Sequence, residues 1–266
     1  MVGLIGLPVS IALASGKGGV GKTALTANLG VALARMGKKV LILDADVYMA
    51  NLAYFINIED MKHTLTDVLK GVAKIDQAVY IGPYNLRVVP SGVALEDMGM
   101  VDPTQLSKVL RQLLKNLDYL FIDAPAGLAT TTITAIQAAQ KTILVTTPTL
   151  DSVSDVLKTS KIVPRLESEN MGFVINMRTN DPTELVAEEI KEILQLPLLG
   201  DIPLDRGMKT ALLRREPLVL TSPRSPFSKR VTQIARKIIA TEAETPEKPR
   251  TPIFSRLISA ITHQTR

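Results

Sequence analysis

Short apolar runs alternate with helix-like segments along almost the whole of this 266-residue chain. Strands that are apolar throughout and separated by helices are typical of a mostly parallel sheet covered on both faces. The predicted buried strands are Val9–Ser15, Lys39–Asp44, Leu86–Pro90, Tyr119–Asp123, Lys141–Thr147, Met171–Asn176 and Leu198–Ile202. The predicted helices are Lys22–Met36, Pro103–Leu117, Leu150–Leu166 and Thr183–Leu194. We therefore expect a single doubly wound α/β domain.

Composition narrows the chemistry of this domain. The chain has no cysteine and two histidines, His63 and His263, which excludes disulfides, iron–sulfur clusters and Cys/His zinc sites. The formal net charge of +5 permits an anionic partner such as phosphate, a lipid headgroup or nucleic acid without requiring one. Mean hydropathy is +0.19, yet we predict no membrane-spanning segment and no signal peptide, and we expect a cytoplasmic protein.

Changes in composition divide the chain into four predicted segments. Residues 1–8 form a short apolar extension without an assigned role, and residues 9–240 carry the alternating pattern. Residues 241–252 (TEAETPEKPRTP) are polar and rich in proline, which predicts a flexible linker. Residues 253–266 again show a helical period and are treated below as a separate tail.

A phosphate-binding motif lies between the first predicted strand and the first predicted helix. Gly16–Thr23 (GKGGVGKT) fits the pattern G-x-x-x-x-G-K-[ST] in the context that the motif needs. The glycines let backbone N–H groups turn toward phosphates, and the helix N-terminus adds a favourable dipole. Lys22 is expected to reach the β- and γ-phosphates, and the Thr23 hydroxyl to ligate Mg²⁺. The motif therefore predicts a nucleotide site.

Acidic residues follow two of the predicted strands. Asp44 and Asp46 lie in LILDADVYMAN, and Asp123 ends the strand in YLFIDAPAG. Open α/β folds bind ligands at the carboxyl edge of the sheet, so we expect these carboxylates to converge on the phosphate loop. Asp123 is predicted to hold Mg²⁺. For Asp44 the sequence leaves open a role in the Mg²⁺ site or a dimer contact and a purely local role in capping the strand.

The loop with its second lysine, Lys17, resembles the deviant Walker A motif of the MinD/ParA group of ATPases, and DAPAG resembles the MinD branch most closely. The resemblance covers roughly residues 9–240 and implies the group's doubly wound P-loop fold, with ATP and Mg²⁺ as cofactors. It implies an ATP-dependent homodimer in which Lys17 contacts the nucleotide of the other subunit. Asp46 would orient the attacking water and assist Mg²⁺, and Gly127 would offer its backbone N–H to the γ-phosphate.

Further downstream the resemblance assigns the base-binding residues. Asn176, at the end of FVIN, would read the adenine, and Pro203 and Leu204 in GDIPLD would pack nearby; a turn residue bonded to its own backbone is the other interpretation of Asn176. The predicted catalytic residues are Lys17, Lys22 and Asp46, and the predicted metal ligands are Thr23, Asp46 and Asp123. The predicted nucleotide-binding residues are Gly16, Lys17, Gly18, Gly19, Val20, Gly21, Lys22, Thr23, Ala24, Gly127, Asn176, Pro203 and Leu204. Ala24 replaces a second threonine that is common in the group.

The tail IFSRLISAITHQTR is amphipathic when drawn as a helix. Its apolar residues fall within an arc of about 140°, with Arg256, Ser259, His263 and Arg266 opposite. Such a helix beyond a linker predicts an interfacial membrane anchor with arginines at anionic headgroups, and MinD-like proteins carry one. The alternative is a last helix that folds back onto the domain. The predicted membrane contacts are Ile253, Phe254, Leu257, Ile258 and Ile261.

These features predict an ATP hydrolase that dimerises on ATP, binds the inner face of the cell membrane peripherally and leaves it on hydrolysis. Turnover is expected to be slow without an activator or cargo protein, and the process positioned is division or another cellular structure. The alternative is a ParA-like DNA-partitioning ATPase that uses Lys229, Arg230, Arg236 and Lys237 on phosphates. A metallocluster carrier is disfavoured by the absence of cysteine, and a non-hydrolysing binding module remains open if Asp46 is not catalytic.

Overall fold

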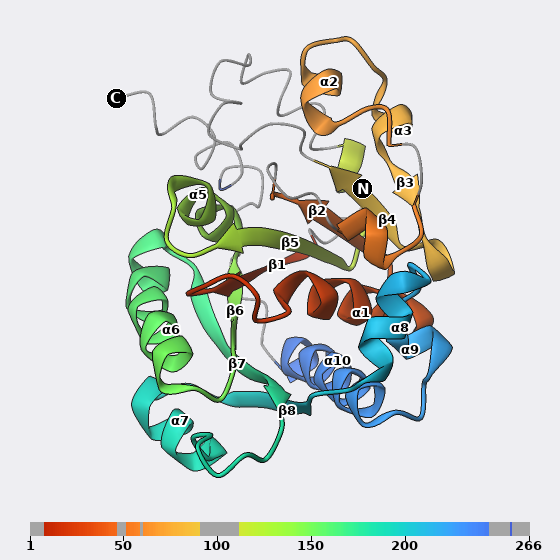
Figure 1. Cartoon of the computed structure of the whole chain (residues 1–266). Helices are drawn as coiled ribbons and strands as arrows, with labels where there is room; N and C mark the ends of the chain where they lie inside the picture. The colour runs from red at the N-terminus through yellow and green to blue at the C-terminus, as the bar shows by residue number, and fades with distance from the viewer. Residues whose placement is uncertain (1–7, 47–51, 59–60, 91–111, 245–255, 257–266) are drawn as a thin grey trace.

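The computed structural model describes residues 8–46, 52–58, 61–90, 112–244 and 256 (Figure 1). Their strands form one sheet of eight in the order β3-β4-β2-β5-β1-β6-β7-β8. Every neighbouring pair is parallel except β3 and β4. The strands are β1 Val9–Ser15, β2 Val40–Asp44, β3 Tyr80–Ile81, β4 Arg87–Pro90, β5 Tyr119–Ala126, β6 Lys141–Thr146, β7 Glu169–Arg178 and β8 Leu198–Pro203. The predicted fold class is confirmed.

Helices cover both faces of the sheet (Figure 1). The longer ones are α1 Lys22–Arg35, α5 Thr130–Ala138, α6 Leu150–Ile162, α7 Ala187–Leu194 and α10 Pro226–Glu244. The short ones are α2 Leu65–Leu69, α3 Ile75–Ala78, α8 Gly207–Leu213 and α9 Leu218–Thr221, with 3-10 turns η1 Leu52–Phe55, η2 Pro83–Asn85 and η4 Val163–Leu166. Helices α1, α9 and α10 contribute to one apolar cluster, and α5, α6 and α7 contribute to the clusters on the other face.

Strand β5 shows why the sheet is buried on both faces. Tyr119 and Phe121 belong to the cluster with α1 and α10, and Leu120 and Ile122 belong to a cluster on the opposite face. Because side chains alternate along a strand, a run that is apolar at every position needs cover on both sides. The central strands therefore fix where the helices must pack.

Several predicted boundaries differ from the structure. Strand β5 continues three residues past Asp123 to Ala126, and its register against β1 shifts where Ser15 pairs with Ala126. The predicted helix Leu150–Leu166 is α6 followed by the turn η4, which contains Pro164. The predicted helix Thr183–Leu194 begins only at Ala187. Strand β3 escaped prediction because its two residues carry too little pattern.

The carboxyl end of the domain also differs from its predicted boundary. Helix α10 continues to Glu244, four residues into the segment predicted as a linker. Lys141 Nζ lies 2.6 Å from Glu242 Oε1, and the two side chains are only 10% and 8% exposed. A close, buried ion pair holds the last turn of the helix against the start of β6. The predictions for residues 1–7, for most of Pro103–Leu117 and for the tail, apart from Arg256, lie outside the described residues.

Within the described residues, no helix is long and apolar enough to cross a membrane.

Gly172 marks a second irregularity, where β7 shifts register against β6. Its φ is 144°, and an added Cβ would lie 2.5 Å from the Pro197 carbonyl oxygen. Backbone cannot yield as a flexible side chain can, so we expect Gly172→Ala to lower the free energy of unfolding by about 2–4 kcal/mol. Urea denaturation measures this. Gly71→Ala is the control, because Gly71 also has a positive φ but no atom lies near the added Cβ. If Gly172→Ala lost no more stability than Gly71→Ala, the steric argument would be wrong.

Candidate functional site

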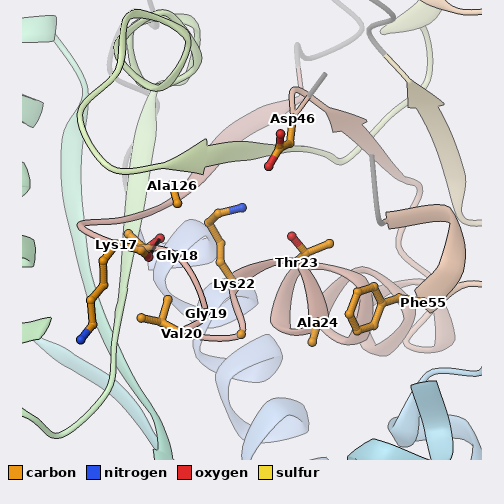
Figure 2. Close-up of a pocket in the computed structure, with 12 residues that line it drawn as sticks. Lys17, Gly18, Gly19, Val20, Lys22, Thr23, Ala24, Asp46, Phe55 and Ala126 are labelled. Carbon is orange, nitrogen blue, oxygen red and sulfur yellow. Dashed lines mark hydrogen bonds between the residues drawn. The ribbon is translucent and has the colours of Figure 1, made fainter. Parts of the chain in front are cut away.

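The loop between β1 and α1 wraps around a cavity at the carboxyl edge of the sheet (Figure 2). Gly19 and Gly21 adopt left-handed φ angles of 79° and 80°, and α1 begins at Lys22. Ser15 Oγ donates to the Lys17 carbonyl, 3.0 Å away, and closes the base of the loop. The cavity has a volume of about 260 Å³ and is lined by Ser15, Lys17, Gly18, Gly19, Val20, Gly21, Lys22, Thr23, Ala24, Asp46, Phe55 and Ala126. Most of the predicted phosphate-binding residues therefore line one cavity.

Two glycines of the loop are required by close packing. A Cβ on Gly16 would lie 2.4 Å from the backbone carbon of Asp155 in α6. A Cβ on Gly21 would lie 2.5 Å from the amide nitrogen of Asn176, which donates to the Val20 carbonyl at 2.8 Å. The side chain of Asn176 is buried, and its hydrogen bond goes to the loop and not to its own backbone. The interpretation of Asn176 as a self-bonded turn residue is wrong, while its predicted contact with adenine stays a prediction.

Lys22 and Asp123 form the buried floor of the site. Lys22 Nζ lies 2.9 Å from Asp123 Oδ1, and the two side chains are 6% and 1% exposed. Thr26, one turn into α1, donates its hydroxyl to the same oxygen at 2.9 Å. The end of β5 is therefore tied to the first turn of the phosphate-binding helix. Figure 2 shows Lys22 and Thr23 pointing to the side of the loop on which Asp46 lies.

Asp44, at the end of β2, lies opposite Asp123 of the neighbouring strand β5. Burial, and then the charge of Asp123, raise the pKa of Asp44 to about 7. The backbone N–H of Asp46 donates to Asp44 Oδ1 at 3.1 Å and opposes that increase in the pKa. Asp44 therefore holds its proton well above the pH at which an exposed aspartate loses it.

The site fits Mg²⁺ only in combination with phosphate oxygens. Oδ2 of Asp44 and Oδ2 of Asp123 are buried and have no hydrogen-bond partner among the described residues. No cluster of three or more acidic or histidine side chains suited to a metal occurs in that part of the chain. Mg²⁺ usually takes one or two carboxylates together with substrate phosphates and water, so Thr23, Asp46 and Asp123 suffice for a nucleotide-bound ion.

Lys17 lines the cavity, but its side chain extends away from Lys22 and Thr23 (Figure 2). Its ammonium pairs with Asp151 at the start of α6, and the two side chains are 36% and 68% exposed. The hydrogen bond from Lys17 is the largest of several contacts that lower the pKa of Asp151. Of the two lysines in the motif, one is buried at the phosphate end and the other is held outward.

The N–H of Gly127 is bound within the protein. Its N–H donates to the Ser15 carbonyl at 2.9 Å, with φ 82°. This bond continues the pairing of β1 with β5 past Asp123. The sequence predicted a strand that ends at Asp123, so this pairing was not expected. The amide must leave Ser15 before it can bind a γ-phosphate, so that predicted contact remains a prediction for the ATP-bound protein.

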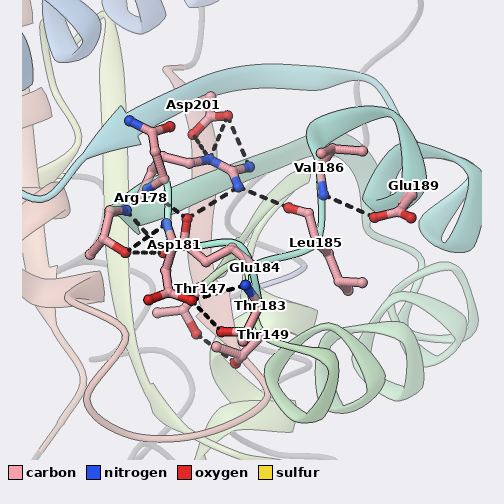
Figure 3. A network of polar contacts seen from close by, with 12 residues as sticks. Thr147, Thr149, Arg178, Asp181, Thr183, Glu184, Leu185, Val186, Glu189 and Asp201 are labelled. Atoms are coloured by element: carbon pink, nitrogen blue, oxygen red, sulfur yellow. Dashed lines mark hydrogen bonds and ion pairs between the residues drawn. The ribbon is translucent and has the colours of Figure 1, made fainter.

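Pro203 and Leu204 lie beyond the phosphate cavity, at the end of β8. Leu204 is 55% exposed, and its N–H donates to the Arg178 carbonyl at 2.8 Å. Arg178 binds Asp201 through Nε at 3.0 Å and the Leu185 carbonyl through Nη1 at 2.8 Å (Figure 3). A second cavity of about 540 Å³ opens beside this network and is lined by Arg178, Asn180, Asp201, Pro203, Pro226, Lys229, Arg230 and Gln233.

Sequence reasoning missed Arg178, Asp201, Phe55 and Ala126. Arg178 lies two residues after Asn176 on β7, so continuing the strand by one alternation identifies it. Phe55 carries no such signal, because it reaches the phosphate cavity from the isolated turn η1.

The raised pKa of Asp44 predicts a pH-dependent penalty on folding. A carboxyl whose pKa is raised on folding stabilises the fold below its unfolded pKa, and that contribution is lost as pH rises toward about 7. Without nucleotide and metal, the free energy of unfolding of Asp44→Asn should therefore exceed that of the parent chain by about 2–4 kcal/mol near pH 8. The difference should shrink as pH falls toward about 4. Urea denaturation across this range measures it, with the exposed Asp76→Asn as control, and a pH-independent difference would contradict the assignment.

The comparisons with known proteins agree with this geometry. A family model described as ParA, NUBPL iron-transfer P-loop NTPase, matches residues 7–239. An uncharacterized ATP-binding protein of Methanocaldococcus jannaschii is 41% identical over 248 residues, which cover 93% of this chain and 94% of that protein. The septum site-determining protein MinD of Synechocystis is 34% identical over 238 residues, which cover 86% and 88% of the two chains.

A solved structure shares the fold. The septum site-determining protein MinD of Pyrococcus horikoshii, solved in complex with Mg-ADP, aligns with a TM-score of 0.79 and 32% identity, over 91% of this chain and all of that one. The family model spans most of the chain, and these relatives exceed 30% identity over most of their length. The chain belongs to the ParA/MinD family of P-loop ATPases.

Proposed function

We propose that this protein is a nucleotide-timed membrane switch. It binds ATP and Mg²⁺, dimerises, attaches to the inner face of the cell membrane through residues 253–266, and is released when ATP is hydrolysed. The observation that carries the proposal is the different placement of two lysines of one loop. Lys22 is buried at the phosphate end, and Lys17 is held outward by Asp151. A lysine directed away from its own cavity can reach the site of a second copy once it leaves Asp151.

The residues of the site supply the parts of a phosphoryl-transfer centre. Loop amides and the start of α1 bind the phosphates, and Lys22 neutralises developing charge on the γ-phosphate. Thr23, Asp46 and Asp123 would hold Mg²⁺, which would offset charge on the β- and γ-phosphates. Asp46 at the mouth of the cavity orients the attacking water. Asn176, which is bound to the Val20 carbonyl of the loop, reads the base in this proposal.

The proposed dimer surface surrounds the phosphate loop. Exposed apolar side chains lie next to the functional residues in the chain, with Leu128 at 36% exposed directly after Gly127 and Leu150 at 67% directly before Asp151. Apolar residues on the rim of a polar site favour a protein partner over open solvent. A second copy of the chain, facing the first across this rim, buries them and brings Lys17 to the other nucleotide.

Membrane attachment rests on the amphipathic pattern of the tail. Partial insertion of its apolar face gains several kcal/mol, but ordering the segment into a helix costs much of that gain. One tail therefore binds marginally, whereas two tails on one dimer bind by avidity with no new contact. Dimerisation by ATP is then enough to switch the membrane affinity, and hydrolysis reverses it.

DNA partitioning is the weaker alternative. Lys237 donates to the carbonyls of Leu198 and Leu199 at 3.4 and 2.9 Å, which occupies part of the basic face of α10. The apolar face of the tail also has no use on DNA. The description of the family model includes iron transfer. Carriage of an iron–sulfur cluster would lack thiolate ligands, because the chain has no cysteine.

The tail should make vesicle binding depend on the nucleotide. Sedimentation with vesicles of phosphatidylglycerol and phosphatidylcholine in equal parts should pellet the full chain at least about tenfold more in a non-hydrolysable ATP analogue than in ADP, because two tails act together. A chain that ends at Pro252 should not pellet in either nucleotide. Equal pelleting of both chains would exclude the tail as the anchor, and an ATP-dependent shift of free DNA in the same samples would favour partitioning.

Lys17 and Asp151, which form an exposed ion pair, should have opposite effects on the dimer. Lys17→Gln should abolish ATP-dependent dimerisation, measured by analytical ultracentrifugation in the non-hydrolysable analogue. Asp151→Asn should instead strengthen the dimer by about two- to fivefold, since it releases Lys17 from an exposed pair worth at most about 1 kcal/mol. Asp155→Asn is the control, because that carboxylate pairs with Lys158 on the same helix. Loss of dimer in Asp151→Asn would mean that Asp151 itself contacts the partner.

A further inference from the structure

A further cavity, which we call the distal cavity, lies at the end of α1 that is remote from the phosphate loop. Helix α1 begins at Lys22, beside the nucleotide cavity, and ends at Arg35, about 20 Å further along its axis. The distal cavity has a volume of about 660 Å³ and is formed by the end of α1, the start of β2 and the hairpin of β3 and β4 with its turn η2. None of the described residues lines both this cavity and the nucleotide cavity. The distal cavity is therefore a separate site.

The lining of the distal cavity is cationic. None of the described residues that line it is acidic, and four carry positive charge, namely Arg35, Lys38, Lys39 and Arg87. Arg35 Nη1 donates to the Val219 carbonyl at 3.5 Å, whereas the other three side chains make no hydrogen bond or ion pair with a described residue. Asp118 accepts from the Lys39 backbone N–H at 2.8 Å but does not line the cavity. A cavity lined by charges of one sign concentrates ligands of the opposite sign, so this cavity favours a ligand with more than one negative charge.

The end of α1 accounts for only part of this charge. Cations are favoured at the carboxyl end of a helix, which explains Arg35 in the last turn of α1. The N–H groups of Met36 and Lys38 already satisfy carbonyls of that turn. Arg87 comes from β4, which pairs with β2, and is half-buried. Because cations from two separate parts of the chain converge on one cavity, capping of the helix does not explain the whole cluster.

The turn η2 adds an exposed aromatic ring to the distal cavity. Tyr84 is 54% exposed and adopts a φ of 55°, and Asn85 follows with a φ of 61°. A left-handed conformation is costly for a bulky residue such as tyrosine, and such strain is concentrated where a side chain is held for function. Ile81, 59% exposed, lies opposite Arg87 in the register of β3 and β4. The cavity thus presents a ring and an apolar side chain next to its cations, which suits a flat ring that carries phosphate groups.

We propose that the distal cavity is a second nucleotide-binding site, which binds the phosphates of a nucleoside diphosphate or triphosphate through its four cations and the base through Tyr84. The two arginines present planar forks of donors that match phosphate oxygens, and the two lysines act as point charges. The concave lining and the volume favour a small ligand over the flat surface of a bilayer. The carboxyl end of α1 carries partial negative charge, so we expect weaker binding here than at the phosphate loop. The proposal does not depend on the membrane function.

The fluorescence of Tyr84→Trp in the full chain tests this site directly. The chain contains no tryptophan, so the new indole is its single one, and a base that stacks on it quenches its emission. ADP should quench this emission saturably, and adding Lys39→Gln together with Arg87→Gln should weaken the affinity by about tenfold or more, because two charge-assisted contacts with phosphate are lost. Lys161→Gln together with Arg165→Gln is the matched control, since it removes one exposed lysine and one exposed arginine elsewhere, and should leave the affinity unchanged. Absence of quenching, or quenching that the first pair of substitutions does not alter, would overturn the proposal.

Equilibrium dialysis with radiolabelled ADP and Mg²⁺ separates the distal cavity from the phosphate loop. The parent chain should bind two ADP molecules, and the variant with Lys39→Gln and Arg87→Gln should keep only the tighter one. If the parent chain binds a single ADP, the tryptophan signal comes from the phosphate loop and the proposal fails. Vesicles of phosphatidylglycerol and phosphatidylcholine, added to a Tyr84→Trp chain that ends at Pro252, test lipid as the source of phosphate. A blue shift of the emission with vesicles, in a protein that ADP does not quench, would assign these cations to lipid headgroups and overturn the assignment to a nucleotide.

Discussion

The buried contact of Lys22 and Thr26 with Asp123 is the constraint on which the nucleotide site depends. It joins the first turn of α1 to the end of β5 across two elements separated by about a hundred positions in the chain. An isolated charge in so buried a position is strongly unfavourable, so lysine and carboxylate are each tolerable because the other is present. Removing either one leaves an uncompensated charge at the floor of the loop.

Asp44 is buried beside this contact. Lys22 pairs with Asp123, and Asp44 lies opposite Asp123 on the neighbouring strand. Burial, and then the charge of Asp123, raise the pKa of Asp44. A site poised in this way has acidic oxygens in excess of its own positive charge, which suits a doubly charged cation arriving with a nucleotide.

The sheet and the loop were predictable because their signals are local. Strands that are apolar at every position and a glycine pattern between a strand and a helix each carry their meaning within a few residues. The partners of Lys17 and Gly127 were not predictable, since Asp151 lies 134 positions from Lys17 and the bond from Gly127 to Ser15 depends on β5 running three residues further than its apolar run. The contacts of Arg178 were missed for a similar reason, because its partner Asp201 lies on the next strand and not among its neighbours in sequence.

The helices connect the two edges of the sheet. The candidate nucleotide site lies at the carboxyl edge, where β1 and β2 end. Helices α5 and α6 each follow the end of one parallel strand and lead to the start of the next, so each runs from the carboxyl edge back to the opposite edge. Because a packed core has few voids, such a helix is held along its whole length by the strands beneath it. The position of the residues at the start of α5 and α6, next to the phosphate loop, is therefore fixed by the packing of the whole layer.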